Sequence, residues 1–419
     1  MKKLIALSMA SVMALSLVAC GGGATASSAA ASSAGTAASS AAGEIEDVTL
    51  TLWAGEEDQD LMKEIAEQFI AENKDKVNLT VNVGVQSESN AKDTVLTDPT
   101  AAADLYHFAD DQLNELVAAG ALMAIPAELN LEDVKSRNLA AAVDAASVNG
   151  TLYAYPATAD NGYFMFYDKS VFTEEDVKTL DKMMEVAAAA GKKVSMEFTS
   201  GWYLYSFFGG AGLTLGLADD GLNTVCDWDC EKGAKVVEAM EAIAANPGFV
   251  SQKDDAFVTG LRNGEVAAGV NGVWNAKVAE EVWGENYSAC KLPTYTLDGE
   301  QVQMSSFSGY KLLGVNPHSK NVGWALMLAD YITNEANQTK RFEVRGQGPS
   351  NIKALENASS PALSALAEQN DYAQLQRVGA NYWANAETLG QLIAAGGEGK
   401  DPQDIVNEAV AGITAPVTQ

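Results

Sequence analysis

The chain has 419 residues, and its 56 acidic side chains outnumber its 27 basic ones, which gives a formal net charge of −29. Such a surface repels phosphate backbones and anionic lipid headgroups, so we expect neither a nucleic-acid partner nor a charge-driven membrane contact. Solubility is our preferred interpretation of the acidity. The chain is also long enough for two domains.

The first twenty residues follow the pattern of a bacterial export signal. Lys2 and Lys3 give a positive start, Leu4–Val18 is a short apolar stretch, and small residues lead to Cys20 in the lipobox run Leu-Val-Ala-Cys. The apolar stretch is too short for a permanent transmembrane helix. We therefore expect residues 1–19 to be a lipoprotein signal peptide. The alternative is an ordinary cleaved signal followed by an accidental cysteine.

Cys20 would then be the first mature residue, with lipid on its sulfur and its amino group. Every residue from Gly21 to Gly43 is Gly, Ala, Ser or Thr. This composition cannot bury a core and behaves as a flexible tether with a reach of about 25–30 Å. We expect residues 20–43 to join a folded body to the outer face of the cell membrane, on a surface of the Gram-positive type.

The folded part opens with a β-α-β pattern. In Val48–Trp53 apolar residues alternate with threonines, which is typical of a half-buried strand. Helical spacing follows from Asp60 to Asn73, and period-two alternation returns from Leu79 to Val85. The pattern predicts two parallel strands joined by a right-handed helical crossover.

Further helices alternate with strand-like runs along the chain. Two of them end at glycines, Gly120 and Gly191, where a residue with a left-handed backbone belongs. The predicted ranges are 110–119, 174–190, 231–245, 322–333 and 402–412. This alternation predicts an α/β protein, and its length predicts two lobes.

One region concentrates large side chains. Asn149-Gly150 predicts a turn, Thr151–Pro156 an extended run, and Tyr163–Tyr167 a second extended run. The polar break between the two runs, Ala157–Gly162, is either a crossing from one lobe to the other or the loop of a plain hairpin. The local spacing leaves both interpretations open.

Besides Cys20 the chain has three cysteines, at 226, 230 and 290. Cys226 and Cys230 could form a small disulfide, or either could reach Cys290, or all three could be free. The two histidines, His107 and His318, are isolated, so the sequence does not predict a metal site. We expect no cofactor.

Five segments, taken in order, resemble a known family. They are Leu50–Gly55, Ala103–Asp111, Asn149–Pro156, Phe257–Trp274 and Asn381–Trp383. Together the segments span nearly the whole predicted mature chain. In their order and spacing they are similar to the extracellular solute-binding proteins of ABC importers, and most closely to the maltose and maltodextrin binders.

The resemblance implies a periplasmic-binding-protein-like α/β fold with two lobes, hinge crossings and a central cleft that closes on a ligand. Lobe 1 would comprise residues 44–157 with about 310–355, and lobe 2 residues 160–305 with about 358–419. The implied partners are an oligosaccharide and a membrane permease whose ATPase is a separate subunit. The protein itself is expected to be a monomer that catalyses nothing.

Sugar chemistry indicates which residues the resemblance would place in the cleft. A pyranose has C–H faces that stack on flat rings and a rim of hydroxyls that bind carboxylates or amides. The implied platforms are Phe108, Trp202 or its neighbour Tyr203, Trp274 and Trp383; the implied polar partners are Glu57, Asp111, Asp160 and Ser200. Each ring could instead fill a core, and a carboxylate that ends a strand, such as Asp110, could be a helix N-cap.

Three positions depart from the maltose pattern. Phe108 stands where that pattern has tryptophan, Asp58 where it has lysine, and Gln112 where it has arginine. Two cationic hydrogen-bond donors are thereby lost, so the sugar's identity stays open between an α-glucan and another oligosaccharide.

The sequence fits other functions less well than it fits sugar binding. A glycosidase needs two carboxylates that flank a bond, and the doublets Glu56-Glu57, Asp110-Asp111, Asp219-Asp220 and Asp254-Asp255 are adjacent residues, which point in different directions. The sequence has no nucleophile elbow, His-Glu-x-x-His or Walker A motif. A cationic solute such as a polyamine is the alternative cargo. An adhesive surface protein would show repeats or sandwich spacing, and neither is present.

Overall fold

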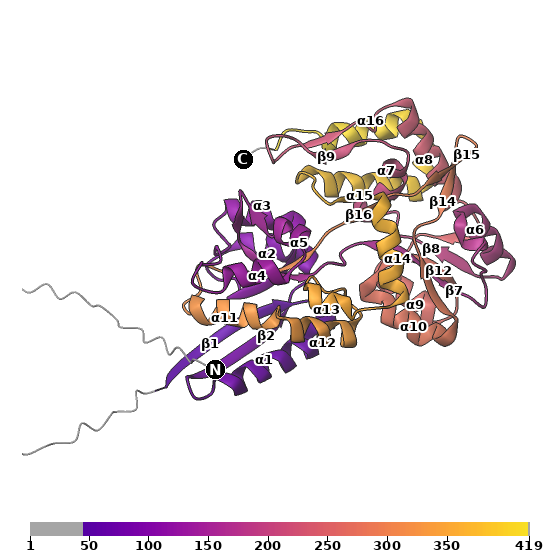
Figure 1. Cartoon of the computed structure of the whole chain (residues 1–419). Coiled ribbons are helices and arrows are strands. Elements are labelled where there is room, and N and C mark those ends of the chain that lie inside the picture. Colours follow the sequence, from indigo (N-terminus) through magenta and orange to yellow (C-terminus); the bar gives the residue numbers. More distant parts are fainter. Residues whose placement is uncertain (1–44, 418–419) are drawn as a thin grey trace, which may run out of the picture. The chain divides into compact units, whose positions relative to one another are not determined.

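The computed structural model describes residues 45–417, and the N-terminal segment with the predicted signal peptide, Cys20 and linker lies outside them. The described residues form two five-stranded sheets, each with helices packed around it (Figure 1). Each sheet has its own apolar core. The α/β class predicted from the alternation is confirmed.

The first sheet has the strand order β2-β1-β3-β17-β6. Its strands are β1 (Glu46–Ala54), β2 (Val77–Val85), β3 (Leu105–Ala109), β6 (Ala154–Thr158) and β17 (Lys311–Val315). Strand β1 pairs in parallel with β2 and β3, whereas β17 runs antiparallel between β3 and β6. The predicted β-α-β unit is therefore present, and a much later strand, β17, completes the sheet.

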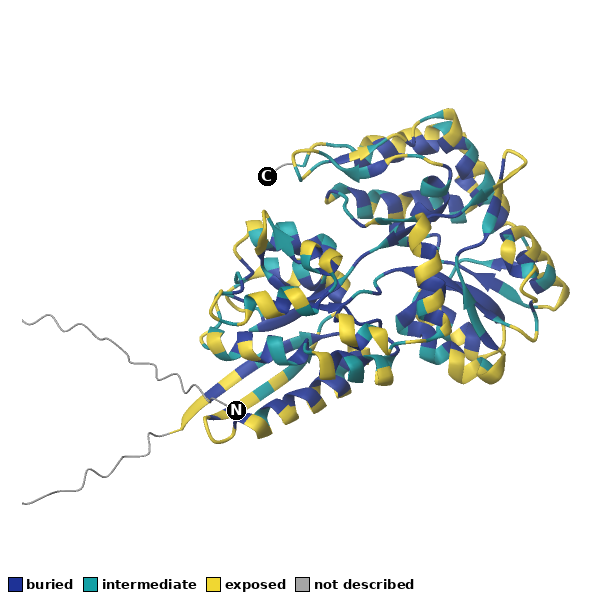
Figure 2. Ribbon diagram, in the orientation of Figure 1, coloured by how far each residue is buried: buried dark blue, intermediate teal, exposed yellow. Residues whose placement is uncertain are grey.

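Helices of the first sheet come from two separate stretches of the chain, residues 59–145 and 322–356. They are α1 (Gln59–Asn73), α2 (Ala91–Thr97), α3 (Leu113–Ala118), α4 (Leu131–Arg137), α5 (Ala140–Ala145), α11 (Val322–Ile332), α12 (Glu335–Arg345) and α13 (Ile352–Glu356). The apolar face of α1 packs on β2, and α11 packs on β17. Strand β3 is buried along nearly its whole length, whereas α1 has a buried and an exposed face (Figure 2).

The second sheet has the order β11-β8-β12-β7-β13. Its strands are β7 (Tyr163–Asp168), β8 (Lys193–Ser195), β11 (Phe249–Val250), β12 (Val266–Gly272) and β13 (Tyr287–Cys290). Strands β11, β8 and β12 are parallel, and β7 runs antiparallel between β12 and β13.

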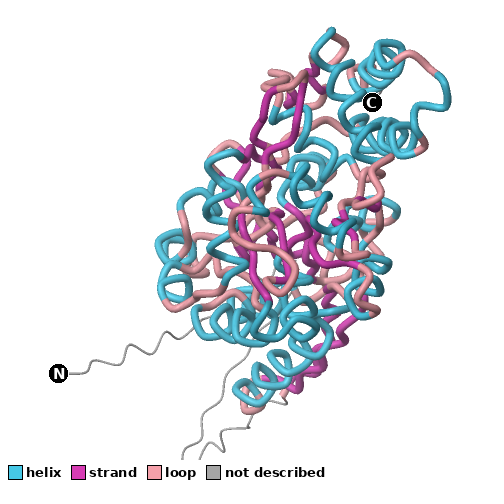
Figure 3. Tube along the Cα trace, turned by 90° about the vertical axis from the view of Figure 1, so that its right-hand side faces the viewer, coloured by secondary structure: helices cyan, strands magenta, loops and turns pink. Residues whose placement is uncertain are grey.

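The helices of the second sheet are α6 (Leu180–Ala189), α7 (Gly201–Gly210), α8 (Glu231–Ala244), α9 (Asp254–Arg262), α10 (Ala276–Trp283), α14 (Pro361–Gln369), α15 (Asn381–Ala394) and α16 (Pro402–Ile413). The last two helices, α15 and α16, pack with α7 and α8 from the middle of the chain (Figure 1), and Figure 3 shows helices gathered beside the C-terminus. The predicted helix at 174–190 begins later than expected, because Thr179 caps α6 by accepting a hydrogen bond from the Lys182 backbone N–H.

Short strand pairs and 3₁₀ turns complete the fold. The pairs are β4 (Ser147–Val148) with β5 (Thr151–Leu152), β9 (Leu215–Leu217) with β10 (Thr224–Cys226), β14 (Thr294–Leu297) with β15 (Glu300–Gln303), and β16 (Ser306–Ser308) with β18 (Ala373–Leu375). The turns are η1 (Glu56–Asp58), η2 (Glu88–Asn90), η3 (Asp110–Gln112), η4 (Asp176–Lys178), η5 (Val273–Asn275), η6 (Gly284–Asn286), η7 (Asn370–Tyr372) and η8 (Gly396–Gly399). Asn149 and Gly150, with φ of 50° and 79°, form the tight turn predicted between β4 and β5.

The polar break at 157–162 is a crossing and not a hairpin loop, because β6 belongs to the first sheet and β7 to the second. The chain crosses back to the first sheet at residues 309–310, between β16 and β17. It crosses to the second sheet once more after α13.

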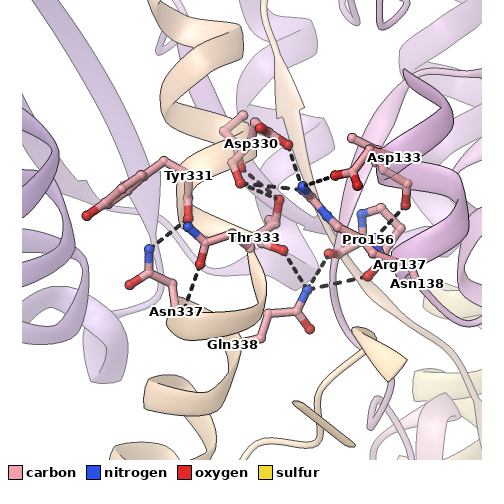
Figure 4. A network of polar contacts seen from close by, with 12 residues as sticks. Asp133, Arg137, Asn138, Pro156, Asp330, Tyr331, Thr333, Asn337 and Gln338 are labelled. Carbon is pink, nitrogen blue, oxygen red and sulfur yellow. Dashed lines mark hydrogen bonds and ion pairs between the residues drawn. The ribbon is translucent and has the colours of Figure 1, made fainter. Parts of the chain in front are cut away.

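A buried polar network around Gln338 holds α12 and the segment before α13 against strand β6 of the first sheet (Figure 4). The Gln338 amide N–H groups donate to the backbone oxygens of Thr333 and Pro156, at 2.9 and 3.2 Å. Its amide oxygen accepts from the backbone N–H groups of Ser350 and Asn351, at 2.8 and 2.9 Å. One side chain thus joins β6, α12 and the segment that leads into α13.

Candidate functional site

A cavity of about 520 Å³ is lined by residues from both sheets. On one wall, Glu57, Glu88 and Asp111 follow the carboxyl ends of β1, β2 and β3. On the other, Glu197, Asp254 and Trp274 follow the carboxyl ends of β8, β11 and β12. Within each set the strands are parallel, so their carboxyl ends meet at one edge of the sheet, where α/β proteins bind ligands.

Two of the half-buried tryptophans in the cavity wall rest on a common aromatic base. Trp202 lies in the first turn of α7 and Trp383 in the first turn of α15. The Trp202 ring stacks on buried Phe307 with centroids 5.4 Å apart and an interplanar angle of 24°, and the Trp383 ring lies 6.0 Å from Phe307. The Tyr163 hydroxyl donates to the Trp202 backbone oxygen at 2.8 Å. These contacts fix the rings and leave part of each indole at the cavity.

The third tryptophan, Trp274, lies in η5 directly after β12. Its indole N–H donates to Asp254 at 3.1 Å, and the other oxygen of that carboxylate accepts from the Asn271 amide at 2.8 Å. The ring lies across Gly272, where a Cβ would be 2.1 Å from the indole. Only glycine at 272 therefore permits this ring position.

Carboxylates dominate the polar part of the wall. Six of them, Glu57, Glu88, Asp93, Asp111, Glu197 and Asp254, line the cavity. Burial and the neighbouring Asp110 carboxyl raise the pKa of Asp111 to about 8. Burial also raises the pKa of Glu197, although the Thr199 hydroxyl, which donates to it at 3.1 Å, opposes this shift. A carboxyl group whose pKa is raised in this way can donate a hydrogen bond when it is protonated and accept one when it is ionised.

Asp110, the adjacent residue, has a structural role. Its carboxylate accepts from the Tyr310 backbone N–H at 3.0 Å and from the Gln376 amide at 2.8 Å. It is not the N-cap that the sequence suggested, because no side-chain capping bond forms at η3. Asp110 instead joins the end of β3 to two segments more than 190 residues later.

Two lysines complete the cavity wall. Lys92 in α2 forms an ion pair of 2.9 Å with Glu115. Lys311, the first residue of β17, is buried, lies 3.7 Å from Glu88, and places its ammonium 5.7 Å from the centroid of the Trp274 ring.

The structure brings together Glu57, Asp111, Trp202, Trp274 and Trp383, and also Ser200 and Tyr203. Phe108 is not among them. Its side chain is fully buried in the core of the first sheet and lies 5.9 Å from the Tyr106 ring. The prediction of an exposed platform at Phe108 is corrected, because β3 is covered on both faces and the chain reaches the cavity only at Ala109.

Asp160 also lies outside the main cavity. It is buried in the first crossing, where its carboxylate accepts a hydrogen bond from the Gly348 backbone N–H. Asp160 lines a second, smaller cavity of about 250 Å³ that includes the crossings at 159–162 and 308–310. This position indicates a role in the crossing and corrects the expectation that Asp160 faces the sugar.

The two positions that lack the cations of the maltose pattern serve the scaffold. Burial alone would raise the pKa of Asp58, but Arg341, then Lys311 and Arg345, hold it well below the usual range, and the two arginines form ion pairs with the carboxylate. Gln112 lines the cavity but donates to the backbone oxygens of Glu88 and Ser89 and so fixes the segment after β2.

Sequence reasoning missed several cavity residues. Asp254 belonged to a doublet considered as a pair for glycoside hydrolysis, yet its carboxylate holds the Trp274 indole. Lys311 opens an otherwise apolar strand, Lys-Leu-Leu-Gly-Val, and a lone charge in such a run is the signal that could have identified it. Glu88, Lys92 and Glu197 lie in segments with no distinctive pattern.

Cys226, Cys230 and Cys290 are free in the structure. No group of three or more potential metal ligands occurs among residues 45–417. Nor does any helix within those residues combine the length and apolar character needed to span a membrane. Residues 1–19, Cys20 and the linker to residue 43 lie outside the described part of the chain.

Comparisons with known proteins agree with this geometry. A galactooligosaccharide-binding protein of Bacillus subtilis (strain 168) is 26% identical over 430 residues, which cover 97% of this chain and 96% of that protein. A structure solved with acarbose is 33% identical, covers 87% of this chain and 100% of its own, and has a TM-score of 0.76. The maltodextrin-binding protein MalE1 of L. casei BL23, solved without ligand, is 26% identical, with coverage of 88% and 100% and a TM-score of 0.73.

A family model described as bacterial extracellular solute-binding protein matches residues 64–368. The resemblance seen in the sequence is thereby confirmed, and so is the periplasmic-binding-protein-like fold. The chain belongs to the family of bacterial extracellular solute-binding proteins.

Proposed function

We propose that this protein binds an oligosaccharide of the maltodextrin type in the cavity between its two sheets and delivers it to the permease of an ABC importer. The observation that carries the proposal is the set of three half-buried tryptophans, Trp202, Trp274 and Trp383, around one cavity rimmed by carboxylates. Flat rings suit the C–H faces of pyranoses, and carboxylates suit their hydroxyls. Relatives that bind maltodextrin or galactooligosaccharide support the same ligand class.

The two walls suggest how binding leads to delivery. Trp274, Trp202 and Trp383 belong to the second sheet and its helices, whereas Glu57 and Asp111 belong to the first. A sugar that contacts both walls binds the closed arrangement more strongly than an open one and therefore shifts the population toward it. The permease would then recognise the closed, loaded protein, and ATP hydrolysis would take place on a separate subunit.

Isothermal titration calorimetry tests the ligand class. We expect maltotriose to bind and spermidine, which represents the cationic alternative, not to bind. A galactooligosaccharide of equal length belongs in the same panel, because a 26% identical relative is a galactooligosaccharide-binding protein. Absence of heat with every oligosaccharide would refute the proposal.

Incubation with maltodextrins should release no new reducing ends, and their appearance would instead identify a glycosidase.

We further propose that Cys20 carries the lipid that holds the protein at the extracellular face of the membrane. Cells expressing the full chain should incorporate labelled palmitate into it and retain it in the membrane fraction. Cys20→Ala should abolish the label and release the protein. Membrane retention of the unlabelled variant would refute this anchor.

We also propose that the protein is a monomer, and light scattering of the folded part should give the mass of a monomer.

A further inference from the structure

Lys311 is unusual among the cavity residues because it is a buried cation. It has 7% of its surface exposed, and its side chain and that of Glu88 are each 9% exposed. Its ammonium lies 3.7 Å from Glu88 on one side and 5.7 Å from the Trp274 ring centroid on the other. Lys311 comes from the first sheet and Trp274 from the second, so the ammonium lies where the two walls approach each other.

The ammonium has no hydrogen bond in the described part of the chain. The contact with Glu88 exceeds hydrogen-bond length, and the indole offers only its face. Lys92, the other lysine in the wall, differs because it donates to Glu115 at 2.9 Å. The ammonium keeps contact with solvent through the cavity, so its N–H donors are available to a ligand that enters there.

Lys311 nevertheless stays charged. Burial alone would lower the pKa of its ammonium, but the surrounding carboxylates, Glu88 foremost and then Asp58 and Asp160, raise it above its usual value. The site thus keeps a full positive charge beside an aromatic platform. A hydrogen bond from such a charged donor is stronger than one between neutral groups.

The scaffold explains why a cation at this position would be useful. Asp58 and Gln112, the positions where the maltose pattern has lysine and arginine, are used for internal contacts with Arg341, Arg345 and the segment after β2. Neither can supply a cationic donor to a ligand. Lys311 is the cavity cation whose N–H groups are free to do so.

We propose that Lys311 is a specificity-determining residue that donates hydrogen bonds to hydroxyls of the sugar unit stacked on Trp274. This inference rests on the proposed function, because it assigns a role within the same cavity. The ring would hold the face of the sugar while the ammonium, held near the ring by the rigid strand β17, selects hydroxyls at its rim. Sugars that lack or invert those hydroxyls would be discriminated against.

The test compares Glu88→Gln with the double variant Lys311→Met/Glu88→Gln by calorimetry with maltotriose. Glu88→Gln serves as the reference because it removes the carboxylate that pairs with Lys311. Replacing Lys311 in this background therefore does not leave an unpaired carboxylate at position 88. We expect the double variant to bind at least ten-fold more weakly than the reference. Lys340→Met removes a half-buried lysine that is paired with Glu64 and does not line the cavity, so its affinity should stay within about two-fold of wild type.

Maltotriose analogues that lack one hydroxyl each provide a readout that a purely structural role would not change. At least one analogue should bind wild type ten-fold more weakly than maltotriose, and that difference should shrink to less than about two-fold in the Lys311→Met/Glu88→Gln variant. The analogue series on wild type also applies if the double variant does not fold: no hydroxyl sensitivity in wild type would overturn the inference.

The outcomes separate this inference from the function on which it rests. If wild type binds no oligosaccharide, the proposed function fails. If wild type binds maltotriose and the double variant matches Glu88→Gln in affinity and in hydroxyl sensitivity, the proposed function stands and the role of Lys311 is refuted.

Discussion

Trp274→Ala is the substitution that most directly probes the sugar platform. The indole is half-buried at the cavity, anchored by its hydrogen bond to Asp254 and laid across Gly272. Removal of the ring deletes a stacking surface but leaves the fold of β12 intact, because the side chain lies in η5, beyond the strand. Trp274→Ala should therefore reduce the affinity for the sugar.

The magnitude follows from the nature of the contact. A well-packed aromatic anchor at a binding site contributes about 1.5–3 kcal/mol, which corresponds to a loss of affinity of about 10- to 150-fold. Trp274→Phe retains a flat ring but loses the N–H that binds Asp254, so its loss should be smaller. Trp383→Ala should lose affinity by about the same factor as Trp274→Ala, since both rings line the same cavity.

The assay is calorimetric titration with maltotriose, accompanied by thermal unfolding of each variant. Trp324→Ala is the matched control: this half-buried tryptophan in α11 packs edge-on against Phe69 with ring centroids 6.4 Å apart, away from the cavity. The control should lose stability and retain affinity. An affinity of Trp274→Ala within two-fold of wild type, with its fold intact, would refute the stacking argument.

Three further predictions concern stability. Because burial raises the pKa of Asp111 to about 8, the folded protein retains a proton that the unfolded chain releases. The free energy of unfolding should therefore fall as pH rises from about 5 to about 8, and Asp111→Asn should reduce that fall. Identical pH profiles of wild type and variant would argue against the shift. Gln338→Ala removes the side-chain hydrogen-bond partner of four buried backbone groups and should cost about 3 kcal/mol or more in denaturant unfolding, against less than about 0.5 kcal/mol for half-buried Thr339→Ala. Phe108→Ala should cost about 3–5 kcal/mol in the same assay, and a loss of affinity without loss of stability would return Phe108 to the binding site.

Local patterns predicted the elements of this fold well where a pattern was long. The alternation in Val48–Trp53 and the helical spacing of Asp60–Asn73 identified β1 and α1 because both elements bury one regular face. The break at 157–162 stayed ambiguous because a crossing and a hairpin loop have the same local composition. Only the insertion of β17 between β3 and β6, more than 150 residues later, distinguishes them.

The site was predictable in part for a related reason. Trp274 and Trp383 were platforms that the family resemblance implied, and both line the cavity. The prediction for Phe108 was wrong because the burial of a strand residue depends on what packs on the two faces of its sheet. The sequence of a single strand does not contain that information. Lys311 was missed because its significance arises from Glu88 and Trp274, which are distant in sequence and meet it only in the folded protein.

A crystal structure of the protein with bound maltotriose tests the central claim most directly. We predict sugar rings stacked on the indoles of Trp202, Trp274 or Trp383, with hydroxyls bound by carboxylates that follow the strands of both sheets. A maltotriose found outside this cavity, or bound there without contact to any of the three indoles, would contradict the account.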